Sequence, residues 1–161
     1  MKRIIIIRHA KSSWEFDVID HERPLNYRGK QDAILISKSL SAIKLNIDQV
    51  LCSDAIRTKS TLNIFKQNLE IKSDIVVFNH DLYDFSGENL LRVVKSVDSS
   101  VNSFMLFGHN HAITNFVNTY GDTFIDNVPT CGVVVIEFDI EAWQDLKSGK
   151  TTKTLFPRDL K

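Results

Sequence analysis

The sequence has no net charge and no long apolar run. Lys and Arg together number 20, and Asp and Glu together also number 20. A chain balanced in this way has no global attraction for nucleic acid or for an anionic membrane. Its first apolar run, Ile4 to Ile7, is too short for the core of a signal peptide or for a membrane span. We therefore expect a cytoplasmic protein that uses neither nucleic acid nor membrane as a partner, so any affinity for anions must come from a local cluster of charge.

Cysteine and linker-like segments are also scarce. The two cysteines are Cys52, which ends an apolar run, and Cys131, which begins one. This placement is typical of buried, reduced thiols. No segment rich in Pro, Gly and Ser divides the chain, and no repeat is visible. With 161 residues, the chain has the usual size of one domain and can bury a hydrophobic core without disulfide bonds or a structural metal ion. We expect a single domain over residues 1–161.

Apolar runs that do not alternate with polar residues recur along the chain. They are rich in Val, Ile and Phe, which is typical of strands buried on both faces. The runs are IIII at 4–7, QVLC at 49–52, IVVF at 75–78, FMLF at 104–107 and GVVVIEF at 132–138. Near the end of the chain, TKTLFP predicts a short edge strand that stops at Pro157.

Helical patterns lie between these runs. Apolar residues recur at spacings of three and four after Asn26, after Ser53 or Asp54, after Ser86, and before Gly121. The polar residues in this set are plausible N-caps. Strands that alternate with helices predict an α/β fold: a three-layer αβα sandwich with a mostly parallel central sheet.

Polar residues follow three of the predicted strands. RHAKS, after the first, carries Arg8, His9 and Ser12; CSDAIRTKST places Arg57 in the first turn of a helix; GHNHA places His109 beside another helix start. Each segment alone is also typical of a solvated loop. Ligands of open α/β sheets, however, bind outside the carboxyl ends of the strands. We expect the arginines and histidines to converge there on a small, dense anion, with phosphate as the best match.

These segments resemble the histidine phosphatase superfamily, also called phosphoglycerate mutase-like, and within it the small phosphohistidine phosphatases of the SixA type. RHAKSSW is similar to the RHG/RHA signature, and PLNYRGKQDA to the PLT-x-x-G-x-x-QA segment. CSDAIRTKST is similar to S-S-x-x-R-A-x-x-T, and LFGHN to GHN/GHE. The resemblance covers nearly the whole chain. It implies a phosphoglycerate mutase-like fold and a phosphatase that needs neither metal nor cofactor.

The resemblance also implies roles for individual residues. His9 would be the nucleophile that takes the phosphoryl group, and His109 would complete the catalytic pair. Arg8 and Arg57 would bind the phosphoryl oxygens. An imidazole must be unprotonated to attack, and crowding several cations into one site favours neutral imidazoles. Further substrate-binding residues expected in the same loops are Ser12 and Asn110.

The proton donor is the most open assignment. The family often has an acid shortly after the third strand, where this chain reads HDLYDFSGENLL. Asp84 matches that position best, while Asp81 and Glu88 compete. Asp84 is equally typical of a cap or turn residue in a loop rich in Ser and Gly.

The other histidines do not predict a metal centre. His111 follows His109 by two residues, but no carboxylate or cysteine stands at the spacing of a zinc site. We expect His21 and His80 to be surface residues, with His21 at the mouth of the pocket as the alternative.

Three functional classes remain open. The favoured class is an enzyme with a phosphohistidine intermediate, acting on a phosphorylated protein or on a small phosphomonoester. The absence of a long insertion after the third strand favours an open site that a protein side chain can reach. The other classes are a non-catalytic phosphate-binding module and a metallohydrolase built on His9, His109 and His111.

Overall fold

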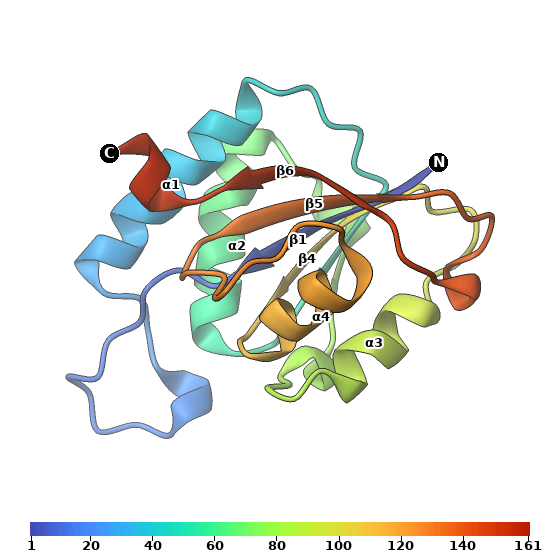
Figure 1. Cartoon of the computed structure of the whole chain (residues 1–161). Coiled ribbons are helices and arrows are strands. Elements are labelled where there is room, and N and C mark those ends of the chain that lie inside the picture. The colour runs from blue at the N-terminus through green and yellow to red at the C-terminus, as the bar shows by residue number, and fades with distance from the viewer.

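A six-stranded sheet forms the centre of the computed structural model, which describes residues 1–161 (Figure 1). The strands are β1 (Lys2–Arg8), β2 (Gln49–Cys52), β3 (Val76–Phe78), β4 (Ser103–Gly108), β5 (Val133–Phe138) and β6 (Lys150–Leu155). Their order is β3-β2-β4-β1-β5-β6. Strands β1 to β4 are mutually parallel, whereas β5 is antiparallel to β1, and β6 to β5. The predicted mostly parallel sheet is confirmed.

Four helices cover the two faces of this sheet. They are α1 (Tyr27–Ser41), α2 (Ile56–Leu69), α3 (Glu88–Lys95) and α4 (Ala112–Tyr120). Helices α1 and α2 pack on one face and α3 and α4 on the other, which confirms the predicted three-layer sandwich (Figure 1). None of the helices combines the length and the hydrophobicity that crossing a membrane requires.

The four isoleucines of β1 are apolar because both faces of this central strand are covered. Ile4 and Ile6 belong to the core formed with α3 and α4, and Ile5 and Ile7 to the core formed with α1 and α2. All four are fully buried. Successive side chains of a strand point to opposite faces, so one run supplies both cores. The strand then ends at the sheet rim, where Arg8 and the residue after it are free to serve a site.

Strand β3 differs from its prediction. The segment IVVF was expected to be a strand buried on both faces, but β3 begins at Val76 and lies at the edge of the sheet. Val77 and Phe78 are about half exposed. A short apolar run cannot by itself distinguish a central strand from an edge strand.

The predicted N-cap of α1 is confirmed, but those predicted for α2 (Ser53 or Asp54) and for α3 (Ser86) are wrong. Asn26 does cap α1, because its side chain accepts the backbone N–H of Gly29. Helix α2, however, begins after Ala55 and α3 after Gly87, neither with a side-chain cap of its own. Ser53 and Asp54, the expected caps of α2, point instead to histidines.

The loop after β1 is pressed against the start of α1. Asn26 donates its backbone N–H to the carbonyl of Lys11, and Ser12 forms an isolated bridge with Leu25. Gly29 lies so close that a Cβ there would be 2.0 Å from the Lys11 carbonyl oxygen. Only glycine permits this approach, which holds the loop that follows β1 in place.

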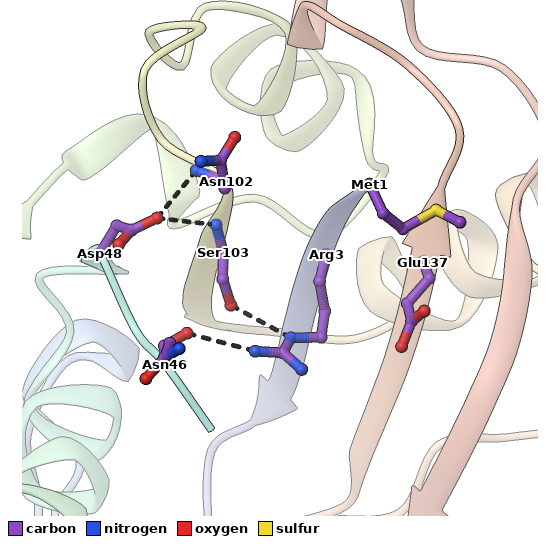
Figure 2. A pocket seen from close by; sticks show the side chains of 7 residues that line it. All are labelled: Met1, Arg3, Asn46, Asp48, Asn102, Ser103 and Glu137. Carbon is purple, nitrogen blue, oxygen red and sulfur yellow. Dashed lines mark hydrogen bonds between the residues drawn. The ribbon is translucent and has the colours of Figure 1, made fainter. Parts of the chain in front are cut away.

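A cavity of about 330 Å³ lies at the amino end of β1, opposite the predicted site (Figure 2). There Arg3 donates to the Ser103 hydroxyl at 3.2 Å and to the Asn46 carbonyl at 3.3 Å. The Asp48 carboxylate accepts the backbone N–H groups of Asn102 and Ser103 (Figure 2). These contacts fasten the loops before β2 and β4, so we assign this cavity a structural role.

Candidate active site

The predicted polar segments meet at the carboxyl ends of β1, β2 and β4. Arg8 is the register partner of Gly108, and the backbone N–H of His9 donates to the Gly108 carbonyl. A cavity of about 230 Å³ opens at this rim. Its lining consists of Arg8, His9, Lys11, Ser12, Trp14, Asp20, Arg23, Arg57, Phe85, His109, Asn110 and Thr130. Every predicted site residue except Asp84 is among them.

His9 is held with one ring nitrogen ready to act as a nucleophile. Its Nδ1 donates to the Ala10 carbonyl at 2.7 Å, which leaves the lone pair on Nε2. Arg57 Nε donates to that Nε2 at 3.3 Å. Burial lowers the pKa of His9 to about 3; the contact with Ala10 opposes this shift, and the charges of Arg57 and Arg8 reinforce it. The imidazole is therefore neutral near pH 7.

His109 is oriented by Ser53. Its Nε2 lies 2.8 Å from the Ser53 hydroxyl, which also accepts the backbone N–H of Ala55. The hydroxyl proton is thus available for Nε2, and we infer that neutral His109 carries its own proton on Nδ1. Burial first, and then the charges of His9 and Arg57, lower the pKa of His109 to about 2. The two catalytic candidates lie with ring centroids 5.2 Å apart.

Two buried polar atoms at this site lack a partner. They are Arg8 Nε and His109 Nδ1. The guanidinium of Arg8 is anchored elsewhere, since its Nη1 donates to the Val128 carbonyl at 2.9 Å. An unpaired buried donor costs about 1–3 kcal/mol. A ligand with several acceptor oxygens would remove that cost at both atoms.

Arg57 is held against the cavity by Asp20. The guanidinium is almost fully buried, and it donates to the Asp20 carbonyl at 2.7 Å and to its carboxylate at 2.9 Å. The same carboxylate accepts from Arg23 at 3.0 Å and from the Tyr83 hydroxyl. Burial alone would raise the pKa of Asp20, but the hydrogen bonds from Tyr83, Arg57 and Arg23 hold it well below its usual range. Asp20 is thus an ionised anchor that aligns two arginines.

Arg23 is the functional candidate that sequence reasoning missed. It is buried, and its Nη1 donates to the Ser12 hydroxyl at 2.5 Å. Its guanidinium carbon also lies 3.5 Å from the centroid of the Trp14 ring, a stacked cation–π arrangement. The available signal was its place directly before the Pro of PLNYRG, the segment that packs against the loop after β1. It adds a third guanidinium to the cavity.

Ser12 and Asn110 line the cavity, as expected, but each is also engaged with protein groups. Ser12 accepts the hydrogen bond from Arg23. Asn110 accepts from the backbone N–H and the hydroxyl of Thr114, and it donates to Asn127 at 2.8 Å. Their substrate contacts remain predictions.

Asp84 lies outside the cavity lining and caps the start of α3. Its carboxylate accepts the backbone N–H groups of Ser86, Gly87 and Leu90 at 3.0–3.2 Å, and the Ser86 hydroxyl at 3.2 Å. The competitors Asp81 and Glu88 do not line the cavity either. The contacts of Asp84 are those of the helix cap, which was the alternative to the proton-donor role.

Of the remaining histidines, His80 is exposed, as expected, and His21 is half-buried. His111 is exposed at the start of α4 and shares no cluster of potential metal ligands with His9 or His109. The sequence did not predict that His21 and His80 both bind the Asp54 carboxylate.

Both cysteines match their prediction. Cys52 and Cys131 are buried and free, and burial raises the pKa of both thiols.

The sequence model of the histidine phosphatase superfamily (branch 1) matches residues 4–85, which is about half of the chain. The chain belongs to the histidine phosphatase superfamily. The matched segment contains Arg8, His9, Arg23 and Arg57, while the segment that carries His109 lies beyond it. Membership of this superfamily supports a phosphatase activity.

Relatives of this superfamily member occur in distant organisms. An uncharacterized chloroplastic protein of Arabidopsis thaliana is 26% identical over 153 residues, which cover 89% of this chain and 70% of the relative. An uncharacterized protein of Mycobacterium tuberculosis is also 26% identical over 153 residues, covering 89% of this chain and 93% of the relative.

Solved structures confirm the fold expected for a histidine phosphatase. The protein histidine phosphatase SixA, complexed with tungstate, matches with a TM-score of 0.80 over 99% of both chains at 20% identity. The similarity spans all of the layers described above and confirms the phosphoglycerate mutase-like, SixA-like architecture.

Proposed function

We propose that this histidine phosphatase acts without a metal ion, through an intermediate phosphorylated on His9, and that its substrate is phosphohistidine on a protein. The observation that carries the proposal is the neutral His9 imidazole, whose Nε2 lone pair faces Arg57 beside two further guanidinium groups. A nucleophile that is unprotonated near pH 7 and surrounded by fixed cations is suited to attack a phosphoryl group.

The phosphoryl oxygens would accept from donors that have no partner within the protein. Arg8 and His109 both line the cavity, and their Nε and Nδ1 atoms have no acceptor in the protein; Arg57 adds the N–H now given to His9. Preorganised donors of this kind stabilise the charge that spreads over the equatorial oxygens in the transition state. SixA, which has the same fold, was solved as a complex with tungstate, a tetrahedral oxyanion like phosphate, and this supports an oxyanion as the ligand.

The reaction would proceed in two transfers. His9 Nε2 forms a bond to phosphorus while the bond from phosphorus to the substrate nitrogen breaks. The substrate imidazole leaves with the electron pair of that bond and takes up a proton from solvent. Water then attacks phosphorus, loses a proton to solvent, and displaces His9 to give inorganic phosphate.

The absence of a free carboxylic acid in the cavity favours a phosphohistidine substrate. The one carboxyl group in the lining, Asp20, is held ionised by two arginines. An alkoxide leaving group needs a proton as its bond to phosphorus breaks. An imidazole leaves far more easily, because its conjugate acid has a pKa of about 6.5.

The surroundings of the cavity favour a protein as the carrier of that group. Only residues 79–87 separate β3 from α3, so no long insertion folds over the site. The segment between Trp14 and Asp20 carries large exposed apolar side chains, of which Trp14 is 76% and Ile19 67% exposed. Exposed apolar groups grouped beside an active site are typical of a protein-binding surface. We infer that they contact the phosphorylated protein.

A substrate panel tests the proposal. Purified chain is assayed after prolonged EDTA treatment on a phosphohistidine protein, an aryl phosphate and several alkyl phosphates. We expect the highest kcat/KM on the phosphohistidine protein and an acid-labile, base-stable phosphoenzyme after rapid quenching. The variant His9→Ala should lose several orders of magnitude in rate and form no phosphoenzyme. The variant His111→Ala, with its exposed histidine outside the cavity, is the matched control and should retain both.

Each other result identifies a different function. A strong preference for alkyl phosphates would make the chain a small-molecule phosphatase. Tight phosphate binding without any turnover would make it a binding module. Complete loss of turnover in EDTA, restored by zinc in the wild type and in His80→Ala alike, would point to a metallohydrolase.

A further inference from the structure

Three loops at the rim of the sheet bring His21, Asp54 and His80 together. His21 lies in the short helix Asp20–Glu22 that follows β1, Asp54 follows β2, and His80 begins the short helix His80–Leu82 that follows β3. The imidazole nitrogens and a carboxylate oxygen of these residues all lie within 4.8 Å of one another. Residues from three separate loops converge here on one point.

The contacts inside this cluster are close. His21 Nε2 lies 2.8 Å from Asp54 Oδ1, and His80 Nδ1 lies 2.9 Å from Asp54 Oδ2. The side chains of His21 and Asp54 are each 29% exposed, so an ion could enter from solvent without unfolding any element. His80 is more exposed, at 71%, and is free to adjust its ring.

The donor set is one that transition metals prefer. Two imidazole nitrogens and one carboxylate oxygen are the protein ligands of many zinc sites with an open fourth position. With bonds of about 2.0–2.2 Å, tetrahedral donors stand about 3.3–3.6 Å apart. The two nitrogen-to-carboxylate distances, 2.8 and 2.9 Å, are slightly shorter than this, while all the donor atoms lie within 4.8 Å of one another, so binding requires a small rearrangement of the side chains, of which His80 is the most exposed.

We propose that His21, Asp54 and His80 bind a divalent transition-metal ion of the zinc type, with water in the fourth position. The ion would fasten together the loops that leave β1, β2 and β3. The first of these loops also carries Asp20, the anchor of Arg57. Metal binding would therefore stiffen one wall of the cavity.

This site is separate from the chemistry at His9. The ring of Tyr83 contacts both histidines of the cluster, with centroids 4.8 Å from His21 and 5.7 Å from His80. The same ring lies 5.3 Å from His109. A metal ion in the cluster is thus one aromatic ring away from the phosphoryl-binding groups and does not replace them. The proposal is compatible with turnover in EDTA and does not depend on the identity of the substrate.

Cobalt titration of the full, metal-free chain tests the site. Tetrahedral Co²⁺ gives intense visible absorption bands, which report the ligand geometry without any measurement of activity. We expect one Co²⁺ per chain, displaced by one Zn²⁺. His80→Ala should weaken binding at least about tenfold, the lower limit seen when even the outer groups of a metal site are lost. His80 is exposed, so this variant should fold.

One control and one further variant distinguish binding at the cluster from binding elsewhere on the surface. His111→Ala removes another exposed histidine near the rim and should bind Co²⁺ as the wild type does. Asp54→Asn retains the shape of the side chain but loses its charge, and it should weaken binding as well. The two cysteines do not compete, because both thiols are buried and burial raises their pKa.

Thermal unfolding provides the second measurement. Zinc in excess over the dissociation constant should raise the Tm of the wild type, since a ligand that binds only the folded state stabilises it. The Tm of His80→Ala should not respond. Absence of stoichiometric binding, or equal binding by wild type and His80→Ala, would overturn the proposal and leave the cluster as a hydrogen-bonded group that joins the loops.

Discussion

His9 and His109 remain neutral beside three arginines because both imidazole rings are buried away from water. Burial is the largest cause of the low pKa at both residues, and the guanidinium charges act in the same direction. Protein contacts take one nitrogen of each ring: the Ala10 carbonyl holds His9, and the Ser53 hydroxyl holds His109. Each ring is therefore fixed in position and in protonation state before a substrate arrives.

The buried histidines should make the protein sensitive to acid. In the unfolded chain a histidine has a pKa of about 6.5, whereas His9 in the fold has a pKa of about 3. Below about pH 6.5 the unfolded state gains a proton that the folded state excludes, so stability falls as the pH drops toward 3 and is unaffected above 6.5. We expect a loss of about 1.4 kcal/mol per pH unit for each of the two histidines within this window.

Urea unfolding at pH 7 and pH 4.5 measures this loss. His9→Gln cannot take up the proton and should lose distinctly less stability than the wild type between the two values. His111→Ala, which removes an exposed histidine, should follow the wild type. Identical losses in His9→Gln and wild type would show that His9 is not held neutral in the fold.

Arg23 should act on the phosphoryl group although it lies outside the three polar segments. Lysine at this position keeps the charge but loses both the fork that reaches Ser12 and Asp20 and the stacking on Trp14. We expect Arg23→Lys to lower kcat/KM by about 10²-fold on every substrate, the scale of one lost preorganised donor. Arg28→Lys, at an exposed position in α1, is the control. A loss confined to one substrate would place Arg23 in substrate selection instead.

At the scale of elements, the start of α3 depends on a residue outside the helix. Gly87 begins α3 in a left-handed conformation and offers no side chain, so Asp84 supplies the acceptors for the first turn. Helix N-termini favour such a carboxylate because their backbone N–H groups lack partners and carry partial positive charge. Asp84, the acid that follows β3, therefore stabilises the start of α3.

Asp84→Asn separates this role from proton donation. Loss of the charge and of one acceptor oxygen should lower the free energy of unfolding by about 1–2 kcal/mol. Activity on an alkyl phosphate and on a phosphohistidine protein should then change by the same small factor. Asp81→Asn, at an exposed position, is the control. A selective loss on the alkyl phosphate, with stability unchanged, would restore Asp84 as the proton donor.

At the scale of the whole molecule, one segment next to the site, residues 14–19, exposes several large apolar side chains. Phe16 and Ile19 are exposed between Trp14 and Asp20, two residues of the cavity lining. Neither Phe16 nor Ile19 belongs to the cavity lining, so a small substrate held in the cavity need not contact them, whereas a protein substrate can.

The double substitution Phe16→Ser and Ile19→Ser should raise KM for a phosphohistidine protein about tenfold or more, which corresponds to about 1.4 kcal/mol of lost contact energy. Its kcat/KM on an aryl phosphate should stay as in the wild type. Phe124→Ser, another exposed apolar residue that lines a different cavity, is the control. An unchanged KM for the protein substrate would show that this segment is not the docking surface.

Much of the fold was determined by patterns that depend only on neighbouring residues. Apolar runs and three-to-four spacing predicted the strands and helices because burial on a strand or a helix has a fixed period. The convergence of Arg8, His9, Arg57 and His109 was predictable as well, since parallel strands bring their carboxyl ends to one rim. The exposure of β3 could not be predicted, because an edge strand and a central strand can have the same apolar sequence.

The sequence by itself thus determined the α/β sandwich and the residues placed directly at strand ends. Only the tertiary structure decided what the loops contribute: Arg23 reaches Ser12, Asp20 reaches Arg57, and Asp54 reaches two histidines instead of capping α2. A loop has no repeating period, so its side-chain directions depend on what it packs against. In the loop after β1, the backbone is positioned by the contact of Gly29 with the Lys11 carbonyl and by the bridge from Ser12 to Leu25.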